Sequence, residues 1–245
     1  MDLPSLGDIH DRYLALARLA RDSGAPAGNG RFGGRLLVRV GFDADGIAVL
    51  IAAGLAGAAA LCVDPDPEPL REGLRRGLCH FLVADLSEAL RILKNEIRRQ
   101  RAVSVCVAAD PNMLLAEMAE RGVQPDLLSV ASSGSLPTAV FRERGAISLP
   151  AAQPDSDTDR VEWSVESDAA RILPRLAQLA AAALDEQRED TPARRHWLTY
   201  APRWLGRSWA GRQCVRMTPA EAQAFTQQAR QDFPALSLAR NPRQK

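Results

Sequence analysis

The stretch LLVRVGFDADGIAVLIAAGLAGAAALCVD, residues 36–64, decides the fold class. Its apolar run at 36–40 predicts a strand, the small residues at 46–56 predict a helix that can lie close to a sheet, and 59–63 predicts a second strand. Asp64 stands at the end of that second strand. A strand, turn, helix and strand ending in an acid is the layout of a dinucleotide-binding unit, in which the helix N-terminus faces a pyrophosphate and the acid faces a ribose.

The turn between the first strand and the helix differs from a glycine-rich phosphate loop. Gly41 and Gly46 are present, whereas Phe42, Asp43 and Asp45 occupy positions at which such a loop favours glycine. Two carboxylates there oppose a diphosphate, because unit charges about 4 Å apart interact by about 1 kcal/mol in water and by more when partly buried. We therefore expect poor nucleotide binding. The aspartates are expected to cap the helix N-terminus, with coordination of a cation as the alternative.

Helices and strands alternate along the chain up to about residue 190. The predicted strands beyond the opening unit are 80–83, 103–108, 127–130 and 161–165, and the predicted helices are 5–23, 67–77, 86–99, 111–122 and 167–187. This alternation predicts a parallel sheet covered on both faces, and right-handed crossovers make it doubly wound. The expected fold class is therefore α/β, Rossmann-like, with an N-terminal helix and a C-terminal basic, aromatic helical extension. The expected domains are 1–34 (helix and linker), 35–190 (Rossmann-like) and 191–245 (extension), the last with a helix at 219–232 that begins in a capping box.

The composition is that of a globular protein, with 46% hydrophobic and 25% charged residues. No apolar run is long enough to span a bilayer, and the N-terminus shows no signal peptide. The four cysteines, at positions 62, 79, 106 and 214, form no CxxC pair, which argues against a metal site and against a disulfide framework. We therefore expect a cytoplasmic protein with reduced, buried thiols and no bound metal.

Charge is distributed unevenly along the chain. The net charge of +1 combines −7 up to residue 191 with +8 beyond it. Four aromatic side chains lie among the arginines of this basic segment: Trp197, Tyr200, Trp204 and Trp209. The segment is expected to pack these side chains on the preceding domain or to mediate self-association, with a homodimer as the expected assembly. A protein partner is the second alternative, nucleic acid is disfavoured, and no membrane partner is expected.

The stretch AVSVCVAADPNMLLAEMAERGVQPDLLSVASSGSLP, residues 102–137, resembles the NAD-binding domain of urocanase (urocanate hydratase). Within it, RGVQPD at 121–126 matches the family pattern without a gap, and PAR at 192–194 is similar to a second family segment. The resemblance covers residues 30–150 and 190–215 in outline. It implies a Rossmann-like fold, NAD that acts as an electrophile on an imidazole, and a dimer. A urocanase is more than twice this length, so most of the catalytic core is not expected in this chain.

The resemblance also assigns site residues. It implies cofactor contacts for Gly41, Asp45, Gly46, Asp64, Asp110, Ser132 and Ser133, and a substrate or anion contact for Arg194. The chain departs from the family pattern where Pro69 replaces an arginine and Asp110 replaces an asparagine. It contains no counterpart of the family's essential cysteine segment, so the catalytic residues stay unassigned.

These departures favour a urocanase-like protein without urocanate hydratase activity that acts as a binding or assembly module. One alternative is a small NAD-dependent lyase or oxidoreductase in which Asp64, Ser132 and Ser133 hold the cofactor. The other is a nucleotide-sensing protein that uses the arginines of the basic segment.

Overall fold

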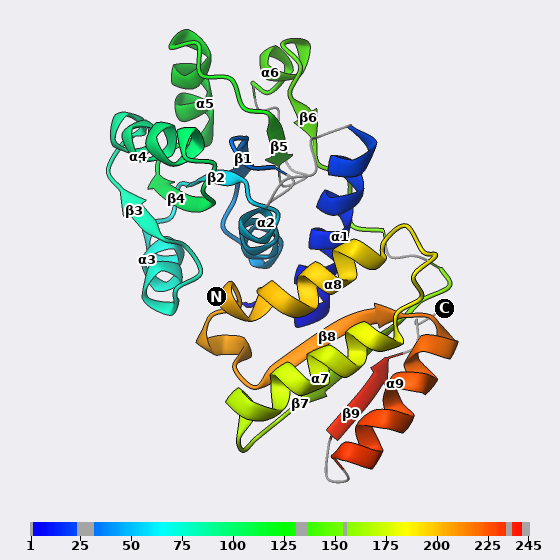
Figure 1. Cartoon of the computed structure of the whole chain (residues 1–245). Helices are drawn as coiled ribbons and strands as arrows, with labels where there is room; N and C mark the ends of the chain where they lie inside the picture. Colours follow the sequence, from blue (N-terminus) through cyan, green and yellow to red (C-terminus); the bar gives the residue numbers. More distant parts are fainter. Residues whose placement is uncertain (1, 24–31, 131–136, 154–155, 234–236, 242–245) are drawn as a thin grey trace.

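The computed structural model describes residues 2–23, 32–130, 137–153, 156–233 and 237–241. Within them, a six-stranded parallel sheet lies beside a smaller antiparallel sheet of three strands (Figure 1). The α/β, Rossmann-like class predicted from the sequence is confirmed, with the N-terminal helix and the C-terminal helical extension.

The parallel sheet has the strand order β3-β4-β2-β1-β5-β6. Its strands are β1 (Leu36–Val40), β2 (Ala59–Asp64), β3 (Phe81–Val83), β4 (Val103–Ala108), β5 (Leu127–Val130) and β6 (Ile147–Ser148). Its helices are α1 (Leu6–Asp22), α2 (Ala44–Leu55), α3 (Pro67–Arg76), α4 (Leu86–Arg98), α5 (Pro111–Glu120) and α6 (Ala139–Glu143). Because β1 pairs with β2 on one side and with β5 on the other, the direction of winding reverses at β1. In open parallel sheets, ligands bind at the carboxyl ends of the strands beside such a reversal.

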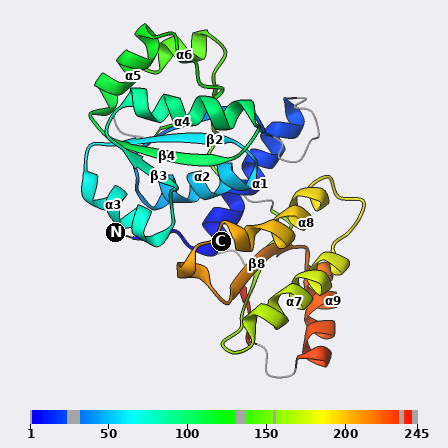
Figure 2. The ribbon, with the colours of Figure 1, turned by 60° about the vertical axis from the view of Figure 1, so that its left-hand side comes forward.

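Helices cover both faces of the parallel sheet. Figure 2 shows α4 and α5 on one side of it and α1 and α2 on the other. Neighbouring residues of one strand accordingly belong to different cores: Val38 packs in the cluster with α4 and α5, whereas Leu37 packs in the cluster with α1 and α2. Burial on both faces explains why β1, β2 and β4 are continuous apolar runs rather than alternating ones.

The predicted strand 161–165 forms, but it does not join the parallel sheet. As β7 (Asp159–Ser164), it pairs antiparallel with β8 (Arg212–Met217) on one side and with β9 (Ser237–Asn241) on the other. The burial of its side chains alternates: Val161 and Trp163 are buried, and the other residues of the strand are half-buried. This is the pattern of a strand with one covered face. The sixth parallel strand is instead β6, which is too short to be recognised in the sequence.

The second sheet is covered by α7 (Ala169–Ala183), α8 (Thr191–Tyr200) and α9 (Pro219–Asp232) (Figure 1). Two short 3-10 helices, η1 (Ala201–Arg203) and η2 (Arg207–Trp209), connect α8 to β8. Strand pairing in this sheet therefore joins residues on both sides of position 190, where the sequence predicts a domain boundary.

The tryptophans of the basic segment pack within the chain, as expected from the sequence. Trp197 and Trp209 are buried, and the Trp197 indole donates a hydrogen bond to the carbonyl oxygen of Cys214 at 2.6 Å. Trp204 lies against Gly54 of α2, where a Cβ atom would come within 2.3 Å of the indole ring. The Trp204 contact joins the extension to α2 of the parallel domain, and self-association stays a prediction.

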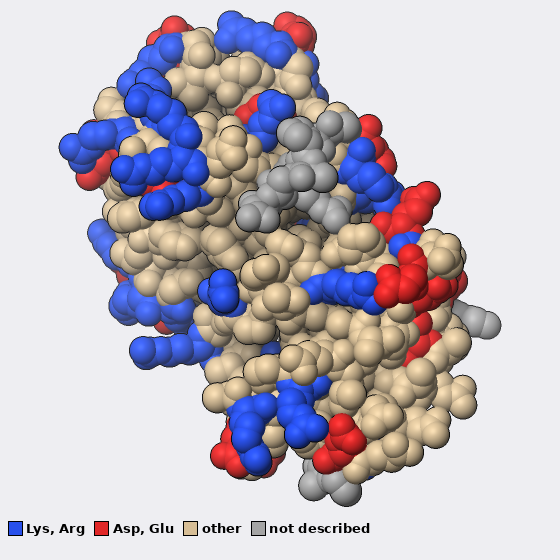
Figure 3. Space-filling model, in the orientation of Figure 1, with Lys and Arg blue, Asp and Glu red and all other residues tan. Residues whose placement is uncertain are grey.

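Charged side chains of both signs lie on the face of the molecule seen in Figure 3. On the side shown in Figure 3, Lys and Arg side chains lie in separate patches with acids among them. Among the helices of the described part of the chain, none combines the length and the apolar character that a membrane span requires.

Candidate functional site

A cavity of about 810 Å³ lies at the carboxyl ends of β1 and β2, where a parallel α/β fold binds ligands. It is lined by Asp2, Phe42, Asp43, Ala44, Asp45, Asp64, Asp66, Glu68, Pro69, Glu72 and Arg75. Carboxylates dominate this lining, and Arg75 is the one cation in it. We call this cavity the acidic crevice.

Two glycines shape the turn at the base of the acidic crevice. Gly41 has a φ of +93°, a conformation that other residues adopt only with strain. A Cβ atom on Gly46 would lie 2.2 Å from the carbonyl oxygen of Gly41, so only glycine allows the helix to begin this close to the strand. Both glycines predicted as site residues are thus required by the backbone, whether or not a ligand binds.

Asp43 is the N-cap of α2. Its Oδ1 accepts a hydrogen bond from the backbone N–H of Gly46 at 2.7 Å, which confirms the capping role for Asp43, whereas Asp45 lies in the first turn of the helix. A dinucleotide-binding fold offers the N–H groups of this helix end to a phosphate. Here a carboxylate of the same chain takes the place of the anion.

Arg39 holds both acids of the turn, a role that the sequence analysis missed. Its side chain is only 1% exposed, and it donates to Asp43 at 2.8 Å and to Asp45 at 3.0 Å. It also bonds the Gly41 carbonyl oxygen and the Ser129 hydroxyl, both at 3.0 Å. Both carboxylates of the turn therefore have a cationic partner within the protein, which the sequence did not predict.

A second arginine reaches the turn from α1. Arg12 donates from Nε to Asp45 at 2.7 Å, so the N-terminal helix helps to fix the crevice. The sequence signal for this cluster was the arginine inside the apolar run LLVRV, because a charged side chain in a strand buried on both faces needs partners. Two acids lie within six residues of that arginine.

Asp64, the residue expected to bind a ribose, is used by the backbone. One of its carboxylate oxygens accepts from the N–H of Phe42 at 2.7 Å, and the other accepts from the N–H of Asp66 at 2.9 Å. These bonds tie the end of β2 to the turn after β1. Asp64 therefore lies where the prediction placed it, but its oxygens already have partners.

The remaining predicted cofactor residues do not join this cluster. Asp110 caps α5 by accepting from the N–H of Met113 at 3.1 Å, and it does not line the crevice. Ser132 and Ser133 lie outside the described residues. The structure thus brings together Gly41, Asp45, Gly46 and Asp64 and leaves Asp110 apart.

Arg194, the residue expected to bind an anion, is a buried side chain of α8. Its side chain is fully buried and donates to Glu221 at 2.8 Å and to the Thr191 hydroxyl at 2.8 Å. Asp190 lies 3.1 Å from the same guanidinium. Arg194 therefore joins α8 to α9, and the anion contact implied by the resemblance stays a prediction.

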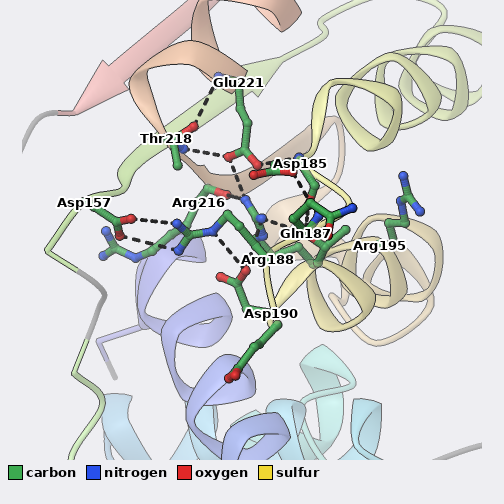
Figure 4. Close-up of polar contacts among 12 residues, drawn as sticks. Asp157, Asp185, Gln187, Arg188, Asp190, Arg195, Arg216, Thr218 and Glu221 are labelled. Atoms are coloured by element: carbon green, nitrogen blue, oxygen red, sulfur yellow. Dashed lines mark hydrogen bonds and ion pairs between the residues drawn. The ribbon is translucent and has the colours of Figure 1, made fainter.

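Further ion pairs connect α1 to the second sheet. Arg216 on β8 binds Asp11 on α1 with two hydrogen bonds, at 2.6 and 2.7 Å, and both side chains are buried. Burial disfavours the charged form of Asp11, but the hydrogen bonds and charges of Arg216 and His10 together outweigh this effect and hold the pKa of the carboxyl well below its usual range. Close by, Arg188 pairs with Asp157 at 2.6 Å and with Asp190 at 3.3 Å (Figure 4).

The described residues contain no group of three or more His, Cys, Asp or Glu side chains arranged to hold a metal ion. All four cysteines are buried and carry free thiols.

A parallel sheet with a turn, a helix N-terminus and a crevice at its winding reversal defines a Rossmann-like α/β protein. Comparison with protein families gives a specific answer: the urocanase family, through its Rossmann-like domain, matches residues 5–141. The match extends over more than half of the chain and contains α1 to β5. The chain therefore belongs to the urocanase family, as the resemblance in the sequence indicated.

Proposed function

We propose that this protein is a member of the urocanase family without urocanate hydratase activity, and that its Rossmann-like domain serves as a binding or assembly module. One observation carries the proposal. The backbone N–H of Gly46, at the N-terminal end of α2 where a phosphate would bind, donates a hydrogen bond to Asp43. Arg39 donates to the same carboxylate.

The residues of the acidic crevice do not fit the diphosphate of NAD. A diphosphate entering the turn must displace a carboxylate from the Gly46 N–H, and it must do so beside Asp45. Displacement also breaks the 2.8 Å pair between Arg39 and Asp43. Both losses oppose NAD binding, since like charges at contact distance repel and the buried guanidinium loses a partner.

The test is a calorimetric titration of the purified protein with NAD, together with an assay for loss of urocanate. We expect no heat of binding at millimolar NAD and no turnover. Replacing Asp43 and Asp45 by glycine frees the Gly46 N–H and leaves Arg39 as an unpaired cation, so NAD affinity is expected to rise by at least about tenfold.

A matched control separates this effect from a general change in charge. Glu72→Gln removes an acid from the same crevice, and Glu72 does not bond the N-terminus of α2. Its carboxylate instead pairs with Arg75 and Arg76. We expect Glu72→Gln to leave NAD affinity unchanged. NAD that co-purifies with the native protein and supports turnover would overturn the proposal in favour of a small NAD-dependent lyase or oxidoreductase. A thermal shift with NAD but without turnover would favour a nucleotide sensor.

The assembly part of the proposal is a homodimer, with a protein partner as the alternative. Because Trp197 and Trp209 are buried, a dimer would use other apolar side chains: Leu74 on α3 and Phe81 on the edge strand β3 are 40% and 44% exposed. An unpaired edge strand can pair with a second chain. Light scattering is expected to give twice the chain mass for the native protein and the single mass for Phe81→Asp; a monomeric native protein would contradict the dimer.

A further inference from the structure

A second cavity of about 810 Å³ lies among α7, the end of α8, the η1–η2 connection and β8, outside the part of the chain that matches the urocanase family. Its lining residues fall in three segments: Ala169, Ala170, Leu173, Pro174, Ala177, Gln178 and Ala181; Leu198, Thr199, Pro202, Arg203, Leu205, Gly206, Arg207, Trp209, Ala210 and Gly211; and Arg212 and Gln213. Figure 1 shows that α7 and α8 lie side by side over the second sheet. We call this space the C-terminal cavity.

The wall of the C-terminal cavity is largely apolar. Leu173 and Pro174 contribute from α7, Leu198 from α8, and Leu205 and Trp209 from the connection to β8. A concave apolar wall of this size is typical of sites for small organic molecules, and a few polar groups then fix the orientation of the ligand.

Gln213 supplies one such polar group on the inner wall. The side chain is only 1% exposed, and its Nε2 donates to the carbonyl oxygen of Leu198 at 2.8 Å. Its Oε1 is buried and has no hydrogen-bond partner among the described residues. A buried acceptor without a partner is unfavourable, and a ligand N–H or O–H that reached it would remove that cost.

Arginines supply the second polar element, at the rim. Within the described part of the chain, no carboxylate forms an ion pair with Arg203 or Arg207, whereas Arg212 pairs with Glu162. Both Arg203 and Arg207 are exposed, and Arg203 lies over the Tyr200 ring at 5.6 Å. A guanidinium without an ion-pair partner is suited to bind a carboxylate.

We propose that the C-terminal cavity binds a small amphipathic carboxylic acid. Its apolar body lies against Leu173, Leu205 and Trp209. Its carboxylate pairs with Arg203 and Arg207, and an N–H or O–H at the other end of the molecule donates to Gln213 Oε1.

Three related probes test each feature of this ligand on the full-length protein by calorimetry. Indole-3-butyrate carries the acid, the apolar ring and a ring N–H. Its methyl ester lacks the charge, and 1-naphthalenebutyrate lacks the ring N–H. We expect indole-3-butyrate to bind about tenfold more tightly than the ester, because a charge-assisted bond is lost, and about fivefold more tightly than the naphthalene acid, because Gln213 stays unpaired. Equal affinity for the acid and the ester, or no heat from any probe at millimolar concentration, would overturn the proposal.

Variants locate the binding in the cavity. Arg203→Ala with Arg207→Ala is expected to remove the preference for the acid over the ester, and Ala177→Phe is expected to abolish binding by filling the space. Arg171→Ala is the matched control, because Arg171 lies on α7, pairs with Asp168 and does not line the cavity. An unchanged preference in the double variant contradicts the proposal. An excess of NAD is expected to leave the affinity for indole-3-butyrate unchanged, which separates this site from the acidic crevice.

Discussion

The acidic crevice and the C-terminal cavity have the same volume but opposite chemistry. In the crevice, the acids of the turn are bonded to backbone N–H groups or to Arg39, so their partners come from within the protein. In the cavity, Gln213 Oε1 and two rim arginines lack such partners within the described residues. The position of a cavity in the fold indicates where members of a family bind their ligand. Polar groups that lack a hydrogen-bond or ion-pair partner indicate where a particular chain can still bind one.

The largest effect is expected at the turn of the acidic crevice. Replacing Asp43 and Asp45 by alanine leaves the buried Arg39 guanidinium without a carboxylate, and we expect the free energy of unfolding to fall by about 3 kcal/mol. Urea unfolding followed by circular dichroism measures this change.

The control for that pair is a second pair of acids that line the same cavity. Glu68 and Glu72 bind exposed arginines, so Glu68→Ala with Glu72→Ala is expected to cost less than about 1 kcal/mol. Equal losses of unfolding free energy in the two double variants would contradict the ion pairs between Arg39 and the acids of the turn.

A smaller effect on the free energy of unfolding is expected at the contact between α1 and α8. There, His10 lies fully buried against Trp197, with ring centroids 4.7 Å apart. Burial lowers the pKa of His10 below its ordinary value of 6.5, and the nearby charges of Arg216 and Arg160 act in the same direction against the opposing effect of Asp11. The unfolded chain therefore binds a proton near pH 6.5 that the folded chain does not, and stability falls as the pH decreases below that value, by at most about 1.4 kcal/mol per pH unit. Asp11, whose folded pKa is depressed, adds a further loss only below about pH 4.

Denaturant midpoints measured by urea unfolding between about pH 8 and pH 3 test this dependence, because that range includes the titration of His10 and the beginning of the loss due to Asp11. His10→Phe is expected to flatten the curve between about pH 6.5 and pH 5 and to leave the acid limb due to Asp11 in place. A variant curve that stays parallel to the native one would mean that another group carries the dependence.

Most of the parallel domain could be predicted from the sequence, and the reason is local. Strands such as 36–40 and 103–108 are continuous apolar runs, and α5 and α9 begin with a capping residue followed by proline, so each carries its own signal. The two-residue strand β6 has no such signal. The pattern of β7 correctly predicts a strand, but it does not indicate which of the two sheets the strand joins.

The second sheet was harder to predict because its burial depends on distant partners. The strand β8 contains Gln213 and Arg216, which look exposed in the sequence, and Arg216 is buried because Asp11 reaches it from the first helix. The burial of Arg194 could not be predicted for the same reason, since its partner Glu221 lies on another helix. The C-terminal cavity, whose wall comes from three separate segments, gives no sequence signal at all.

The smallest effect on stability is expected at the rim of the C-terminal cavity, and it tests the comparison most directly. Arg203 and Arg207 are exposed and have no ion-pair partner among the described residues, so replacing both by alanine should change the free energy of unfolding by no more than about 0.5 kcal/mol. The same double variant is expected to lose the preference for an acidic ligand. Urea unfolding without ligand and with indole-3-butyrate separates the two results, because a ligand that binds only the folded protein raises its stability. If the double variant loses more than about 1 kcal/mol without ligand, then the arginines serve the fold, and their lack of partners does not mark a binding site.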